Sequence, residues 1–162
     1  MSSLDLPAKV LRSDHTSDGQ FIETCYIHFK SDFVDSAPQF RNTRMGLKRL
    51  PARNGKEATF YHMTTTGTDE AHRTIEIDRS ERIRWARPVI ENEGRPELRI
   101  WTERKRGENR IHIWHHIENY VVVVSERNGY HVPWTAFYVN YSNYHDKLER
   151  RWLRNREHDP YK

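Results

Sequence analysis

Residues 97–141 constrain the fold more than any other part of the chain, because short runs suited to strands follow one another there with very short connections. Polar and apolar residues alternate over residues 98–104 and again over residues 110–116, and a glycine-containing turn lies between them at residues 105–109. Consecutive strands joined in this way pair antiparallel. The sequence therefore predicts an antiparallel meander of three or four strands.

The later strands of this meander differ in their surroundings. Residues 120–124 are apolar without alternation, which indicates a strand covered on both faces at the middle of the sheet. An Asn-Gly pair then turns the chain into residues 130–141, where Pro133 lacks a backbone N–H. We expect this last strand to lie at a sheet edge or to contain a bulge.

Amphipathic helices are expected before and after the meander along the chain. Apolar side chains recur every three or four positions over residues 21–40, and Pro38 is expected to end that helix. Near the C-terminus, Tyr144, Leu148 and Trp152 recur at the same spacing, as in a helix packed by an aromatic stripe. The fold class predicted is α+β, with an N-terminal helix or helices, a sheet of about four antiparallel strands and a C-terminal helix.

The segment between the first helix and the meander is less regular. The basic residues 41–57 include an Asn-Gly turn pair and suit a hairpin. Residues 58–66 are rich in β-branched and aromatic side chains, so we expect a strand, whereas residues 71–80 fit either a loop or a strand. Residues 82–88 alternate charged and apolar groups, but Pro88 limits them to a short edge strand or an extended loop.

A chain of 162 residues is long enough for one domain with its own core and too short for two ordinary domains plus a linker. Residues 1–18 show no sustained period and are interpreted as a flexible lead-in. Residues 19–158 are expected to form a single α+β domain, followed by a tail at residues 159–162.

Missing patterns disfavour several classes of protein. The chain has no run of 18 apolar residues and starts without the features of a secretory signal, so neither a membrane span nor conventional secretion is expected. The single cysteine, Cys25, excludes an internal disulfide and a thiolate zinc site and favours a cytoplasmic location. There is no P-loop, Rossmann glycine pattern, nucleophile elbow or HExxH motif. We expect no cofactor, no metal and no membrane partner.

Basic charge is concentrated in three segments. Residues 41–57 carry six basic side chains against Glu57 alone, and residues 79–87 and 99–110 each carry an excess of three positive charges, whereas the whole chain carries +4. Such clustering favours an anionic partner such as a nucleic acid. Ordinary basic loops of a soluble protein would show the same pattern.

Three histidine and threonine positions are candidates for chemistry. His62 precedes a polar glycine loop, where a side chain can meet a ligand, or else it is a structural, hydrogen-bonded histidine. His112 is expected to share a strand face with His116, and surface histidines are the simpler interpretation there, since a metal site needs further convergent ligands. Thr135 is expected opposite Trp134, with a hydroxyl that donates either to a phosphate or to a neighbouring carbonyl.

The arginine-rich run near residue 82 is the remaining candidate. Arg82 and Arg84 stand two apart, so an extended segment would present both to successive phosphate oxygens. Trp85 would stack on a base or fill the core. The alternative is a solvated, salt-bridged edge strand.

Three segments carry a family resemblance: FYHMTTTG at residues 60–67, RSERIRWARPVIEN at 79–92, and the run at 112–139 that ends in HVPWTAFYV. Over about residues 20–150 the chain resembles a bacterial and prophage-encoded family whose domain is similar to the barnase, colicin and RelE type of nuclease. The resemblance implies a helical N-terminal part, a four-stranded antiparallel meander, and cleavage of RNA without a metal. Fold carries over from such a resemblance more securely than activity does.

The resemblance also implies a set of site residues. The catalytic residues expected are His62, Arg82, His112, Thr135 and Tyr138. In attack of a ribose 2′-OH on the adjacent phosphate, His62 would be acid or base, with His112 or Glu81 as its partner. Arg82, helped by Arg84 or Arg99, would hold the phosphate.

The side chains expected to bind nucleic acid are Arg84, Trp85, Arg87, Arg99, Lys105 and Arg106. Two alternatives remain open. One is a phage protein that binds nucleic acid without cleaving it and uses Trp85, Trp101 or Trp114 as a stacking surface. The other is a module that binds a protein inhibitor or a host partner through exposed aromatic side chains.

Overall fold

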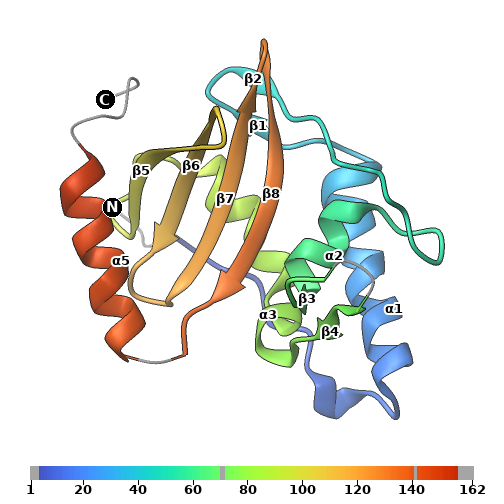
Figure 1. Ribbon diagram of the computed structural model, residues 1–162. Helices are drawn as coiled ribbons and strands as arrows, with labels where there is room; N and C mark the ends of the chain where they lie inside the picture. The colour runs from blue at the N-terminus through green and yellow to red at the C-terminus, as the bar shows by residue number, and fades with distance from the viewer. Residues whose placement is uncertain (1–3, 70–71, 141, 157–162) are drawn as a thin grey trace.

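Four consecutive strands form one antiparallel sheet in the order β5-β6-β7-β8 (Figure 1). The computed structural model describes residues 4–69, 72–140 and 142–156. The strands are β5 (Leu98–Lys105), β6 (Glu108–His115), β7 (Tyr120–Arg127) and β8 (Tyr130–Tyr138). Each neighbouring pair is antiparallel, so the predicted meander and the α+β class are confirmed.

The edge strand β8 contains the bulge that Pro133 led us to expect. Val123 pairs with Thr135 and Val124 pairs with Pro133, so Trp134 is an extra residue on β8. A bulge interrupts the alternation of side chains between the two faces. The expectation that Thr135 and Trp134 lie on opposite faces is therefore wrong, because both line the same cleft, described below.

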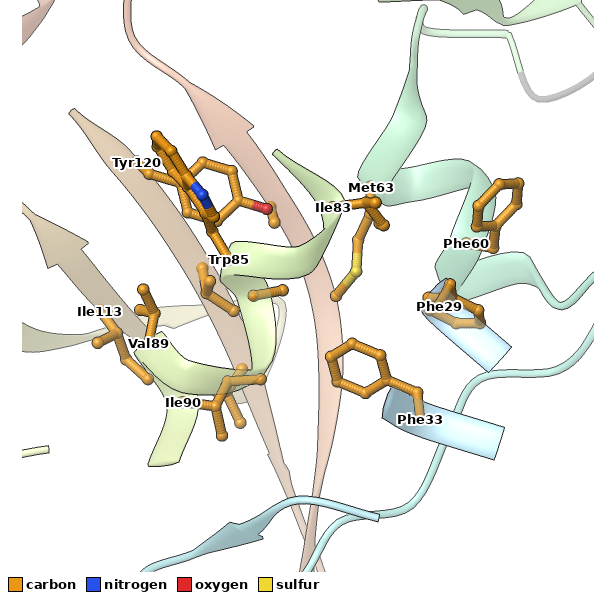
Figure 2. Close-up of a cluster of buried hydrophobic side chains, with 14 of the residues drawn as sticks. Phe29, Phe33, Phe60, Met63, Ile83, Trp85, Val89, Ile90, Ile113 and Tyr120 are labelled. Atoms are coloured by element: carbon orange, nitrogen blue, oxygen red, sulfur yellow. The ribbon is translucent and has the colours of Figure 1, made fainter. Parts of the chain in front are cut away.

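Two layers of helix cover the sheet, one on each face (Figure 1). The larger layer precedes the sheet in sequence and packs on these sheet residues: Ile111, Ile113, Tyr120, Val122, Val124 and Ala136. Figure 2 shows Trp85, Val89 and Ile90 of this layer beside Ile113 and Tyr120 of the sheet. The predicted placement of β7, buried on both faces, is confirmed.

The first helix of the larger layer is α1 (Asp18–Phe29), which continues as a π-helix over Lys30–Val34. Ser17 caps its N-terminus by accepting a hydrogen bond from the Gln20 amide. Its apolar stripe is buried as the spacing predicted, at Phe21, Cys25, Phe29 and Phe33. The helical stretch ends before Pro38, as expected.

Residues 58–64 form a helix, α2 (Ala58–Thr64), so the strand expected there is wrong except for the last two residues, β3 (Thr65–Thr66). The helix buries Phe60, Met63 and Thr64, which share one face at i, i+3 and i+4. The Thr64 hydroxyl donates to the Phe60 carbonyl oxygen at 2.8 Å, a bond that accommodates threonine inside a helix. Burial of this face outweighs the β propensity of the segment.

Residues 82–88 are also helical, and the expected edge strand or extended loop is wrong. A 3₁₀ turn, η4 (Ile83–Trp85), leads into α4 (Ala86–Glu91). Pro88 lies in the first turn of α4, where a backbone N–H has no intrahelical acceptor. Ile83, Ala86 and Ile90 are fully buried at helical spacing.

Short elements connect these helices. They are η1 (Arg12–Asp14), β1 (Gln39–Phe40), β2 (Thr43–Arg44), β4 (Thr74–Ile75) and α3 (Ile77–Glu81). The hairpin expected in residues 41–57 around the Asn-Gly pair is wrong: that pair is closed only by an isolated bridge between Arg53 and Lys56, and the short β1-β2 hairpin begins before the segment and turns at residues 41–42. β3 pairs with β4 beside the edge strand β8 (Figure 1).

Residues 4–17 pack on the helical layer ahead of α1. Val10 is buried and its amide donates to the Glu81 carbonyl oxygen at 2.8 Å. The Trp85 indole N–H donates to the Pro7 carbonyl oxygen at 2.7 Å. The predicted tail, residues 159–162, lies outside the described residues.

The predicted C-terminal helix is present as α5 (Ser142–Asn155), and it covers part of the opposite sheet face. Leu148 is fully buried against Trp101 and Trp114, and Tyr144 and Trp152 pack on the same cluster. α5 runs beside β5 in Figure 1 and leaves the β8 side of this face uncovered. None of the helices in the described part of the chain has the length and apolarity that a membrane span requires.

Candidate functional site

A cleft of about 260 Å³ opens on the α5 side of the sheet, between β8 and α5. It is lined by Glu103, Lys105, Arg110, His112, Val123, Trp134, Thr135, Phe137, Tyr144 and Arg151. Three basic side chains thus face one carboxylate, beside three aromatic rings. Positive charge next to exposed aromatic surface suits a phosphate attached to a planar base.

Cross-strand pairing and α5 together build the charged end of this cleft. Glu103 pairs with Arg110 across β5 and β6, and Trp101 pairs with His112. Arg151 reaches in from α5, and its Nε donates to Glu103 Oε2 at 2.8 Å. The Trp101 indole N–H donates to the same carboxylate oxygen at 2.6 Å, so Glu103 is held in place by two donors.

His112 lies against this ion pair. Its ring stacks on Trp101 with centroids 5.0 Å apart and planes within 9°. The Nδ1 N–H donates to the Arg110 carbonyl oxygen at 3.2 Å, which leaves Nε2 as the acceptor for Arg151 Nη2, also at 3.2 Å. The lone pair of His112 therefore faces the guanidinium of Arg151.

These contacts set the charge states of the cleft. Burial, followed by the charge of Arg151, lowers the pKa of His112 to about 4, so the imidazole is neutral at neutral pH. Burial acts to raise the pKa of Glu103, but the Trp101 hydrogen bond and the charge of Arg151 outweigh it, and the net shift is downward. The cleft at neutral pH therefore holds an ionised carboxylate and an uncharged imidazole.

Cations surround the bulged Trp134. The guanidinium carbon of Arg110 lies 4.1 Å from the centroid of the indole, and Lys48 Nζ lies 4.6 Å from it. Arg127 stands further away, at 6.0 Å, and both arginines also pair with Glu108. The indole is half-buried, so one part of it stays open to a ligand.

His62 touches the cleft through Trp134. Its ring is buried and meets the indole edge-on, with centroids 5.4 Å apart. The Thr135 hydroxyl donates to the His62 backbone carbonyl oxygen at 2.7 Å, and this bond ties α2 to β8. Of the two interpretations of Thr135, the structure shows the bond to a neighbouring carbonyl.

Arg82 and Tyr138 lie on the other face of the sheet from His112. The guanidinium carbon of Arg82 sits 3.5 Å from the centre of the Tyr138 ring, and its Nη1 donates to the Asp78 carbonyl oxygen at 2.7 Å. The five expected catalytic residues therefore do not form one site. His112 and Thr135 share the cleft, whereas Arg82 and Tyr138 stack on each other behind β8.

Three of the residues expected to bind nucleic acid make contacts within the helical layer. Arg84 Nη1 donates to the Ala8 carbonyl oxygen at 3.3 Å, and the Trp85 indole anchors Pro7. Arg87 Nη1 donates to the Asp32 carbonyl oxygen at 2.9 Å. These side chains hold the helical layer and the segment before it together, away from the cleft.

The other three expected binding residues lie on β5 or in the turn that follows it. Lys105 lines the cleft, and Arg106 is exposed in the β5-β6 turn. Arg99 stacks on Trp152 of α5, with its guanidinium carbon 4.4 Å from the ring centroid, and pairs with Glu149 at 3.1 Å. Lys105 is thus the only one of the expected binding residues that lines this cleft.

Among the cleft residues that the sequence did not identify as site residues are Glu103, Arg110, Trp134 and Arg151. The alternation of β5 and β6 carried a signal for two of them, since Glu103 stands two positions from Lys105, and Arg110 two positions from His112. Trp134 was missed because the bulge breaks the alternation. Arg151 comes from a helix whose placement over the sheet the sequence pattern does not specify.

No family model, no curated protein and no solved structure matches this chain. Within residues 4–69, 72–140 and 142–156, no group of three or more His, Cys, Asp or Glu side chains is placed to hold a metal ion.

Proposed function

We propose that this protein is a metal-independent endoribonuclease and that the cleft between β8 and α5 is its active site. One observation carries the proposal: His112 and the ionised Glu103 lie in the same cleft as Lys105, Arg110 and Arg151. A phosphoryl transfer from RNA needs a proton acceptor and fixed positive charge around the phosphorane, and this cleft contains both.

The chemistry begins when a phosphate enters the cleft. Arg151 Nη2 turns from His112 Nε2 to a phosphate oxygen, and the lone pair of His112 is released. The ribose O2′ attacks phosphorus while its proton passes to Nε2, and the bond from phosphorus to O5′ breaks. O5′ takes a proton from solvent, and His112 later returns its own proton to solvent. The products are a 2′,3′-cyclic phosphate and a 5′-hydroxyl.

The other charged side chains of the cleft and the Trp134 indole assist this step. Arg110 and Lys105 stabilise the charge on the phosphorane, and Trp134 stacks on a neighbouring base. Glu103 stabilises the imidazolium formed when His112 accepts the proton. The negative charge of the bound phosphate also favours the protonated form of His112. In the free protein, the charge of Arg151 disfavours that form.

The test is incubation of labelled single-stranded RNA with the purified protein in EDTA, followed by analysis of product ends. We expect cyclic phosphate ends from the wild type and a loss of roughly 10²–10⁴-fold in rate for His112→Ala, the range for removal of a general base. His116→Ala is the matched control, because His116 lies nearby but bonds to the Pro96 carbonyl oxygen outside the cleft. Cleavage by His112→Ala at the wild-type rate, or intact RNA with every protein, would overturn the proposal.

A second candidate function is RNA binding without cleavage. The observation that favours it is the bond from Arg151 to His112 Nε2, which occupies the lone pair that a general base needs. RNA that stays intact in EDTA but binds with an affinity that falls steeply as salt rises would select this function. Loss of that binding in Arg110→Ala would place it at the same cleft.

A further inference from the structure

A second hollow, of about 310 Å³, lies beside the cleft at the edge of β8. It is lined by Thr66, Glu76, Arg79, Phe137, Tyr138, Val139, Asn140 and Tyr144. Phe137 and Tyr144 line the cleft as well, so the two hollows meet at this pair of rings. The rings contact each other edge-on, with centroids 6.2 Å apart. The two hollows therefore lie side by side at the edge of β8 with these rings between them, and the pair of hollows is here called the groove.

Arg79 provides the positive charge of the second hollow. Its Nη1 donates to the carbonyl oxygens of His62, at 3.0 Å, and Thr65, at 2.8 Å, which fixes the guanidinium in place. Its Nη2 faces Glu76 Oε2 at 3.4 Å, longer than a charge-assisted hydrogen bond usually is. A phosphate oxygen could therefore compete with Glu76 for this nitrogen.

Polar atoms without partners gather behind this hollow. Among the described residues, Nε of Arg79, Nε of Arg82 and the hydroxyl of Tyr120 are buried and have no hydrogen-bond partner. Arg82 stacks on Tyr138, which lines the hollow, and Tyr120 is paired with Tyr138 across β7 and β8. All three groups can donate a hydrogen bond, and none of them has an acceptor among the described residues.

We propose that the groove binds single-stranded RNA over several nucleotides, with Arg79 as the ligand of a second phosphate. This inference rests on the proposed function, because it assumes that the first phosphate occupies the cleft beside Arg110. The strand then passes over Phe137 and Tyr144, where an unpaired base stacks, and its next phosphates reach Arg79. Bases paired in a duplex are not free to stack on these rings, so the groove selects single strands.

The test uses 2′-O-methyl oligonucleotides, which lack the attacking hydroxyl and so report binding alone. Fluorescence anisotropy compares a dinucleotide, a hexanucleotide and a hairpin duplex at several salt concentrations. We expect the hexanucleotide to bind more tightly than the dinucleotide. The slope of its log affinity against log salt concentration should be steeper by about 0.7 for each added phosphate contact. The duplex is expected to bind less tightly than the single-stranded hexanucleotide.

Two substitutions separate Arg79 from general effects on the fold. Arg79→Gln should lower the ratio of hexanucleotide to dinucleotide affinity. It should also reduce the slope of log hexanucleotide affinity against log salt concentration by about 0.7. Glu76→Gln should raise the hexanucleotide affinity, since it frees Nη2 of Arg79, and a misfolded protein would not show that gain. Arg150→Gln, which removes an exposed charge of α5, is the control for net charge.

The outcomes distinguish this inference from the function on which it rests. Affinity that does not grow with length, or Glu76→Gln with unchanged hexanucleotide affinity, would overturn the second phosphate site while the cleft remains a ribonuclease site. Equal or tighter binding of the duplex would overturn the selection of single strands. Failure of both the dinucleotide and the hexanucleotide to bind would overturn the inference and the proposed function together.

Discussion

The protonation of His112 is controlled by the charged groups around it. Burial and Arg151 disfavour its protonated form, while Glu103 on the other side favours it. An approaching phosphate changes this balance in one direction, because it adds negative charge and attracts Arg151. The same side chain is thus a weak base in the free protein and a stronger one with RNA bound.

His112 should also make stability depend on pH. Its pKa is about 4 in the folded chain and near the ordinary 6.5 when unfolded, so the unfolded state binds more protons between these values and stability falls as pH falls through this window. From pH 7 to pH 5 the loss is about 2 kcal/mol. Urea unfolding at both pH values should show a smaller pH effect in His112→Gln than in wild type. An equal pH effect in the two proteins would mean that His112 titrates normally.

The bulge in β8 puts the Trp134 side chain on a face of the sheet that regular alternation along the strand would not give it. It turns Trp134 into the cleft beside Thr135, and it brings the indole next to Lys48 and Arg110. In the helices α2 and α4, by contrast, tertiary packing overrode the local sequence preference. Their β-branched residues and Pro88 suggested extended chain, but burial of one helical face against the sheet decided their conformation.

Trp134→Ala should weaken RNA binding, because base-aromatic stacking contributes about 1–3 kcal/mol per base, or roughly 5- to 150-fold in affinity. Anisotropy with the 2′-O-methyl hexanucleotide measures the change. Tyr130→Ala is the control, an exposed aromatic at the start of the same strand. Equal affinities for wild type and Trp134→Ala would remove the stacking role of the indole.

Leu148 should be the main apolar anchor of α5. It is fully buried between the helix and the tryptophans of β5 and β6, so Leu148→Ala is expected to cost about 2–5 kcal/mol in unfolding free energy. Leu153→Ala, on the same helix but 51% exposed, should change stability by less than about 0.5 kcal/mol. Similar midpoints for both variants in urea would show that α5 contributes little to the fold.

At the scale of the whole molecule, the sheet and the two flanking helices could be predicted from sequence because their patterns are local. Alternation, Asn-Gly turns and the apolar stripe of α1 depend on neighbours a few positions away. The site could be predicted only in part, because it joins residues from distant segments. His112 and Lys105 were named from their strands, but their contact with Arg151 depends on how α5 lies over the sheet, a tertiary arrangement that the sequence pattern does not encode.

The order of elements along the chain has a consequence for synthesis. Residues 18–91 emerge from the ribosome before β5 to β8 exist, and the apolar faces of α1, α2 and α4 then have no sheet to cover them. The four strands, in contrast, pair only with sequence neighbours, so each new strand closes a short loop at small entropic cost. The sheet formed by residues 98–138 can therefore assemble quickly and provide the surface on which the earlier helices pack.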